Sequence, residues 1–107
     1  MSHNFTNIIR LIQNNDIRIS DHGYDELAND KLTVREIVSG ASNAVLVEDY
    51  PNYNKGASVL VLQKDNQGLP VHVVWGIPKG FKNPCVLITA YRPDILKWDK
   101  TFKVRKR

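Results

Sequence analysis

Apolar residues near the N-terminus recur three and four positions apart, which is the spacing of amphipathic helices. Within residues 4–13 they form one stripe, made of Phe5, Ile8, Ile9, Leu11 and Ile12. The spacing predicts a helix over 4–13, capped at Asn4 or Thr6 and ended by the polar run at 14–16. Residues 17–19 alternate apolar and polar positions like a brief strand.

Two further helices are predicted from their start signals. Ser20 suits an N-cap, and the pattern after it predicts a helix over 21–31. Thr33 and Glu36 have the spacing of a capping box, which predicts a third helix over 34–39 that a glycine ends.

From residue 44 the hydrophobic period changes to two, and turn-forming residues separate the alternating runs. Four strands are predicted, over residues 44–50, 58–64, 71–77 and 86–91. A helical turn over 94–98 would bury Trp98, and 101–105 would add a short edge strand. The prediction is one α+β domain over 1–107, with two or three N-terminal helices packed on a four-stranded antiparallel β-sheet meander. A basic tail begins at about residue 100.

The turn between the last two predicted strands sets an expected register. If it centres between Gly80 and Phe81, His72 lies opposite Thr89. Alternate residues of a strand point the same way, so His72, Thr89 and Tyr91 would share one face of the sheet. A slip of one residue would move His72 to the other face relative to its partners.

Charge adds an expectation about partners. Hydrophobic residues make up 42 % of the chain and charged residues 24 %, as in folded proteins, and the net charge is +4. An anionic partner is therefore expected: RNA, DNA, an acidic protein or a phosphorylated small molecule. Six cations crowd the C-terminal end: Lys97, Lys100, Lys103, Arg105, Lys106 and Arg107.

Cys85 is the only cysteine, so no intrachain disulfide is expected and a reducing cytoplasm is the natural location. No secretory signal and no apolar run long enough to span a bilayer is visible, so no membrane association is expected.

Two histidines are candidates for chemistry. His72 interrupts an apolar strand, either as a core histidine bonded to a hydroxyl such as that of Thr89, or as a general acid or base. His22 is either a surface residue or a phosphate ligand at a helix N-terminus. The two lack the short spacings of a zinc site, so neither a metal nor a cofactor is expected.

Tyr91 and Arg92 stand where the last strand must stop at Pro93. One interpretation is structural, with a half-buried ring and an ion pair from Arg92 to Asp94. The other is phosphate binding, because a guanidinium matches two phosphate oxygens. No Gly-rich phosphate loop or dinucleotide fingerprint is present.

Four short segments and a tryptophan carry a resemblance that covers the chain from residue 17 to about 105: Ile19-Ser20-Asp21-His22, Glu48-Asp49-Tyr50-Pro51, Pro70-Val71-His72-Val73-Val74, Ile88-Thr89-Ala90-Tyr91-Arg92-Pro93-Asp94 and Trp98. In these the chain resembles a bacterial family catalogued as domain of unknown function 4258. That family is distantly similar to the RelE/ParE/BrnT-like toxins, many of which are metal-independent ribonucleases of toxin–antitoxin systems.

The resemblance implies a RelE-like fold. It also implies a site made of His22, His72, Thr89 and Tyr91, with Arg92, Lys103 and Arg105 as phosphate ligands. The chain departs from the family pattern after His22, where acidic Asp25 and Glu26 would repel a phosphate.

Two functions remain open. The first is a toxin that cleaves RNA without a metal: His72 or His22 deprotonates the ribose 2′-hydroxyl, and the other histidine or Tyr91 protonates the leaving oxygen. Its partners would be RNA and a cognate antitoxin protein. The alternative is a non-catalytic module that binds an acidic protein or nucleic acid through the basic tail and the exposed sheet face, with structural histidines.

Overall fold

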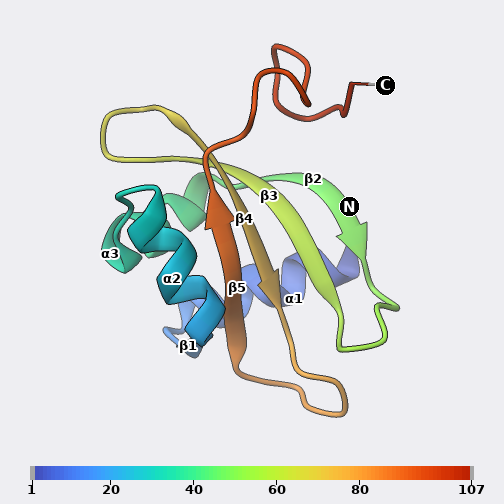
Figure 1. The fold of residues 1–107 in the computed structure, drawn as a ribbon. Helices are drawn as coiled ribbons and strands as arrows, with labels where there is room; N and C mark the ends of the chain where they lie inside the picture. The colour runs from blue at the N-terminus through green and yellow to red at the C-terminus, as the bar shows by residue number, and fades with distance from the viewer. Residues whose placement is uncertain (1, 107) are drawn as a thin grey trace.

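The computed structural model describes residues 2–106 and contains three α-helices, a short 3-10 helix and a five-stranded sheet. Helices α1, α2 and α3 come first in the chain and bury their apolar sides against one face of the sheet (Figure 1). The other face is called the open face below. Figure 1 shows the C-terminal part of the chain at one end of the sheet, where Trp98 and Phe102 contact His72 on this face. The helices span His3–Gln13 (α1), Asp21–Asn29 (α2), Val34–Gly40 (α3) and Ala41–Asn43 (η1).

The predicted helix starts are confirmed for α2 and α3. The Ser20 hydroxyl accepts a hydrogen bond from the Gly23 N–H at 2.9 Å. Thr33 and Glu36 form both bonds of the capping box. Helix α1 differs, because its cap is Ser2 rather than Asn4 or Thr6. Asn4 is buried instead, and its amide donates to the Asp49 carboxylate and the Ser58 carbonyl.

The sheet contains the predicted antiparallel meander, and one strand that the prediction did not place in it. Strands β2 to β5 pair in succession, and β1 adds to the outer side of β5 in parallel, giving the order β1-β5-β4-β3-β2. The sheet is thus mixed and five-stranded, which corrects the expected four antiparallel strands. The strands span Ile17–Ile19 (β1), Val45–Tyr50 (β2), Ser58–Lys64 (β3), Pro70–Gly76 (β4) and Cys85–Tyr91 (β5).

The predicted β4–β5 register is wrong by two residues, because His72 lies opposite Tyr91 and Thr89 lies opposite Val74. Two one-residue errors add up to this shift. At the β4–β5 loop the pairing is displaced by one residue, so that Gly76 faces Val86 rather than Cys85, and a β-bulge at Ile88 adds the second residue. An even shift preserves the alternation, so His72, Thr89 and Tyr91 still share the open face.

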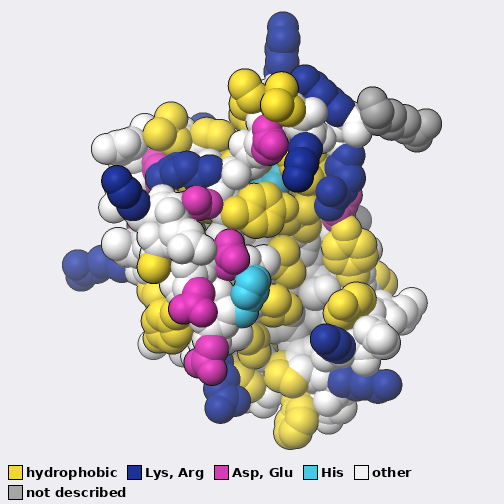
Figure 2. All heavy atoms as spheres, in the orientation of Figure 1, with side chains coloured by type: hydrophobic (Ala, Val, Ile, Leu, Met, Phe, Trp, Pro, Cys, Tyr) yellow, Lys and Arg dark blue, Asp and Glu magenta, His cyan; other side chains and the backbone are white. Residues whose placement is uncertain are grey.

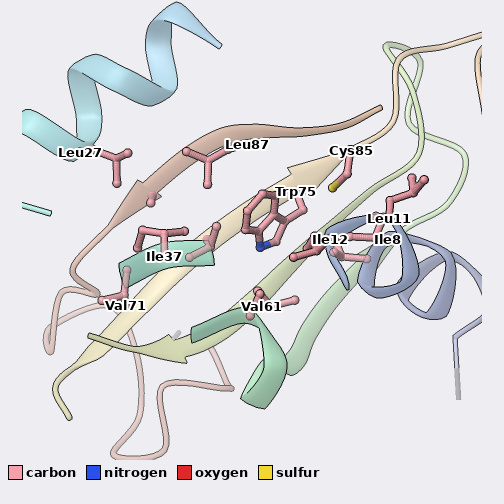
Figure 3. Packing of buried hydrophobic residues seen from close by; sticks show 14 of the residues in the cluster. Ile8, Leu11, Ile12, Leu27, Ile37, Val61, Val71, Trp75, Cys85 and Leu87 are labelled. Atoms are coloured by element: carbon pink, nitrogen blue, oxygen red, sulfur yellow. The ribbon is translucent and has the colours of Figure 1, made fainter. Parts of the chain in front are cut away.

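The core lies between the helices and the other face of the sheet. Figure 3 shows Ile8, Leu11, Ile12, Leu27 and Ile37 of the helices directed at Trp75, Leu87 and other apolar residues of the strands. One polar side chain is built into this layer. Gln63 accepts a hydrogen bond from the Trp75 indole at 3.0 Å and donates to the Ile37 carbonyl at 2.7 Å. No helix among residues 2–106 is long and apolar enough to cross a bilayer.

After Tyr91 the chain forms what we call the C-terminal segment, residues 93–106. The predicted turn after Asp94 is present, since the Lys97 N–H donates to the Asp94 carbonyl. The predicted edge strand over 101–105 is absent. Instead a single bridge pairs Trp98 with Arg105, so the intervening residues form a closed loop.

Candidate functional site

The predicted site residue His72 is completely buried and lies beneath the C-terminal segment. Its Nε2 atom lies 2.7 Å from the Phe102 carbonyl oxygen, so Nε2 carries the proton and donates it. The imidazole ring makes edge contacts with Tyr91 and Trp98, at centroid distances of 5.4 and 4.4 Å. These contacts favour the structural interpretation of His72, with a backbone carbonyl as its partner rather than the Thr89 hydroxyl.

Burial lowers the pKa of His72, with a smaller contribution from the Arg105 charge, while the bond to Phe102 and the Glu48 charge act in the opposite direction. The ring is therefore neutral near pH 7, and its second nitrogen, Nδ1, is buried and has no hydrogen-bond partner among residues 2–106. In this arrangement no solvent or substrate atom reaches either nitrogen. A catalytic role for His72 stays a prediction, and it requires the C-terminal segment to move away.

Arg105 joins the C-terminal segment to the edge strand β2. Its guanidinium donates two hydrogen bonds to the Glu48 carboxylate, at 2.8 and 2.9 Å, and lies 4.6 Å from the centre of the Trp98 ring. The Tyr50 hydroxyl donates to the same carboxylate. The hydrogen bond from Arg105 is the main reason that the pKa of Glu48 lies below its ordinary value.

These residues form one connected group, which we call the His72 cluster and which holds the C-terminal segment on the open face. It consists of His72, Tyr91, Trp98, Arg105, Glu48 and Tyr50. Burial raises the pKa values of Tyr91 and Tyr50, so both phenols stay protonated at neutral pH. The Trp98 side chain is only 4 % exposed, which makes it the anchor of the segment.

Arg92 forms an ion pair, as one interpretation of the sequence expected, but with Asp65 rather than Asp94. The two charged groups lie 2.9 Å apart, and Asp65 also accepts hydrogen bonds from the backbone N–H groups of Gln67 and Leu69. Burial works against the Asp65 charge, yet these bonds outweigh it and lower the pKa of the carboxyl. Arg92 therefore locks the β3–β4 turn to the end of β5.

His22 lies away from the His72 cluster, in the first turn of α2. Its imidazole is exposed and lies 3.7 Å from the Glu26 carboxylate. Figure 2 shows acidic side chains gathered on the α2 side of this face. A phosphate at His22 would meet this negative charge. His22 pairs with Glu26, whereas His72 contacts Phe102, Tyr91 and Trp98.

The remaining predicted residues are Thr89 and Lys103. Thr89 is half-buried on the open face, and Lys103 is exposed in the C-terminal segment. The structure thus brings together His72, Tyr91 and Arg105. His22 and Arg92 lie apart from them, paired with Glu26 and Asp65. No group of three or more His, Cys, Asp or Glu side chains within residues 2–106 is arranged to hold a metal ion.

Sequence reasoning missed Glu48, Tyr50 and Trp98 as neighbours of His72. Glu48 and Tyr50 stand two residues apart on β2, which places them on one face and was a usable signal. No local pattern indicated that Arg105, 57 positions later, would bind them.

A family model described as domain of unknown function (DUF4258) matches residues 19–92 of the chain. The resemblance to this family is therefore confirmed, although helix α1 and the C-terminal segment lie outside the matched residues. No curated protein and no solved structure matches the chain.

Proposed function

The chain belongs to the DUF4258 family, and on that premise we propose that it is a non-catalytic RNA-binding module whose C-terminal segment forms the contact surface. The observation that carries this proposal is the way the His72 cluster fixes a basic stretch of chain. A frayed tail would lose conformational entropy on binding, whereas a docked segment has already lost most of it.

The C-terminal segment is strongly basic. Residues 93–106 contain five cations and two carboxylates. Arg105 is bound to Glu48, but the lysines of the segment are exposed and form no ion pair with the residues that the structure describes: Lys97, Lys100, Lys103 and Lys106. Figure 2 shows Lys and Arg side chains around this end of the molecule. Phosphate groups are the natural partners of such unpaired lysines.

Salt dependence of RNA binding tests the proposal. The test variant carries glutamine in place of Lys97, Lys100, Lys103 and Lys106. For single-stranded RNA, each phosphate contact contributes about 0.7 to the magnitude of the slope of log K against log salt concentration. We therefore expect the slope to fall by about 2–3 and binding at 0.1 M salt to weaken at least tenfold.

A matched control carries glutamine in place of four cations elsewhere: Arg18, Lys31, Arg35 and Lys64. Each variant loses four positive charges, so only the position of the charges differs. Equal weakening in the two variants would show that net charge, and not the C-terminal segment, governs binding.

RNA cleavage is the second candidate function, and a different observation favours it. A carboxylate, a phenol and a guanidinium lie together at Glu48, Tyr50 and Arg105. The side chains of Glu48 and Arg105 are 24 % and 58 % exposed, so a substrate can reach them. The Glu48 carboxylate would take the proton of the ribose 2′-hydroxyl, whose oxygen would attack the adjacent phosphorus. The bond to the 5′-oxygen would break as Tyr50 protonates it, leaving a 2′,3′-cyclic phosphate, while Arg105 would neutralise the charge that develops.

This second function ranks lower because Arg105 lowers the pKa of Glu48, and a weak base accepts a proton poorly. Incubation of RNA with the purified protein and a metal chelator tests it. Cleavage should be lost in Glu48→Gln and kept in Asp49→Asn, which neutralises the neighbouring carboxylate on the other face. An intact RNA with the wild-type protein would remove cleavage from consideration and leave the binding proposal standing.

A further inference from the structure

A groove lies beside the β4–β5 loop. Figure 1 shows this loop at the end of the molecule opposite the C-terminal segment. It has a volume of about 600 Å³ and is formed by α1, the β2–β3 loop and the β4–β5 loop. This volume lies within the range of small-molecule and cofactor pockets. The groove therefore offers space for a base together with its sugar and phosphate.

Three cations line the groove: Arg10 from α1, and Lys79 and Lys82 from the β4–β5 loop. All three are exposed, and none forms an ion pair within residues 2–106. Two carboxylates stand close by and keep their charge, since each accepts a hydrogen bond from a neutral amide, but the three cations outnumber them. Asp49 accepts the Asn4 amide, and Asp16 accepts the Asn83 amide. The groove is thus a positively charged surface whose cations lack an anionic partner.

Two exposed aromatic rings accompany these cations. Tyr53 is 54 % exposed and Phe81 is 69 % exposed, and both line the groove. A large apolar ring that is left in water and lies beside cations is a common feature of single-strand binding sites. There, bases stack on the rings while the cations follow the phosphates. A duplex cannot use such rings, because its bases are already stacked and paired.

We propose that this groove binds a short stretch of single-stranded nucleic acid. Phosphates would lie against Arg10, Lys79 and Lys82, and a base would stack on Phe81 or Tyr53. The groove shares no residue with the proposed RNA surface on the C-terminal segment, so the two surfaces can be changed separately. An acidic protein would satisfy the cations as well, but it would have no planar bases to stack on the aromatic rings.

Fluorescence anisotropy with labelled ten-nucleotide RNA and DNA single strands, and with the matching duplex, tests the proposal on the full chain. The first variant, Lys79→Gln with Lys82→Gln, should weaken single-strand binding about tenfold and reduce the salt slope by about 1.4. The second, Phe81→Ala, should weaken single-strand binding about tenfold while leaving duplex binding within twofold of the wild type. All three side chains are exposed, so the thermal midpoint should not change.

The control pair Arg35→Gln with Lys64→Gln removes two cations outside the groove and should change binding by less than twofold. Equal loss in both lysine pairs, or unchanged single-strand binding in Phe81→Ala, would overturn the groove proposal. Binding to anionic lipid vesicles or an acidic peptide, with none to single strands, would also overturn it. The four-lysine variant of the C-terminal segment separates the two surfaces: if only that variant loses binding, the groove proposal fails and the proposed function stands. If only the groove variants lose binding, the groove proposal stands and the proposed function fails.

Discussion

His72 can be removed in two ways that separate its packing from its titration. The variant His72→Ala deletes the ring, whereas His72→Phe keeps a ring of similar size and abolishes the proton and the hydrogen bond. Both leave the Phe102 carbonyl without its donor. If His72 is the structural anchor that its contacts indicate, both variants lose stability, and by different amounts.

The expected magnitudes follow from the contacts. The Phe102 carbonyl is half-buried, and loss of its donor costs about 1–3 kcal/mol, which is the expected loss for His72→Phe. His72→Ala additionally loses two edge-on aromatic contacts, each of about 0.5–1.5 kcal/mol, and leaves a cavity in the middle of the sheet. We expect about 3–5 kcal/mol for His72→Ala, measured as the change in the free energy of unfolding in urea.

The pH dependence of stability adds a readout that packing alone does not change. Burial lowers the pKa of His72 in the folded state, so the unfolded chain takes up its proton first, near pH 6.5. As the pH falls below about 6.5, the free energy of unfolding therefore decreases by up to about 1.4 kcal/mol per pH unit until the folded state is protonated too. The carboxylates Glu48, Asp65 and Asp99, whose pKa values are also lowered, add their own loss only in more acidic solution.

Urea unfolding at pH 7.5, 6.5, 5.5 and 5.0 for the wild type and both variants completes the assay. The wild type should lose stability from pH 6.5 to 5.0, and His72→Phe should lose less over the same interval. Parallel pH profiles for these two proteins would refute the buried, neutral state of His72. Unchanged stability in His72→Ala, together with lost RNA cleavage, would restore the catalytic interpretation.

Three further predictions concern other parts of the molecule. Gln63→Ala leaves the buried Trp75 indole N–H without an acceptor. It should lower the free energy of unfolding, measured by chemical denaturation, by about 2–4 kcal/mol. The exposed-site control Gln67→Ala should stay within about 0.5 kcal/mol of the wild type. The Cys85 thiol is buried, and burial raises its pKa to about 12. A thiol reagent at pH 8 should therefore modify it only at the rate of unfolding. Rapid labelling of the folded protein would contradict the packing of β5. Asp65→Asn removes the charge that Arg92 neutralises and should cost about 1–3 kcal/mol at pH 7, with a difference from the wild type that shrinks near pH 3, as a thermal-unfolding series would show.

Local signals in the sequence predicted local structure well. The capping box of Thr33 and Glu36 involves residues three apart, so its hydrogen bonds follow from the chain itself. The alternation of the strands likewise identified which residues share a face. His72, Thr89 and Tyr91 lie on the open face even though the predicted partners were wrong, because face is set by parity and the register error was even.

Contacts between distant segments could not be predicted in the same way. The parallel pairing of Ile17–Ile19 with β5 joins residues nearly seventy positions apart, and no turn between them sets its register. The bulge at Ile88 carries no Gly or Pro signal. Arg92 was expected to pair with Asp94, two residues away. In the fold it pairs with Asp65, which lies in the turn between β3 and β4.

The candidate site shows the same division. Sequence reasoning identified His72, Tyr91 and Arg105, which the structure brings into one cluster. It could not indicate that Trp98 and Phe102 return to cover His72, because that contact depends on the path of the closed loop between Trp98 and Arg105. Burial, which decides between an acid–base histidine and a structural one, is a property of that path.

The most direct test of the proposed function is a titration of the isotopically labelled protein with single-stranded RNA, followed by the chemical shifts of its backbone amides. RNA binding through the docked C-terminal segment predicts the largest changes in residues 95–106, which diminish together as salt is raised, with the His72 cluster remaining folded. RNA that binds to saturation while the amides of residues 95–106 stay unchanged would contradict the proposal.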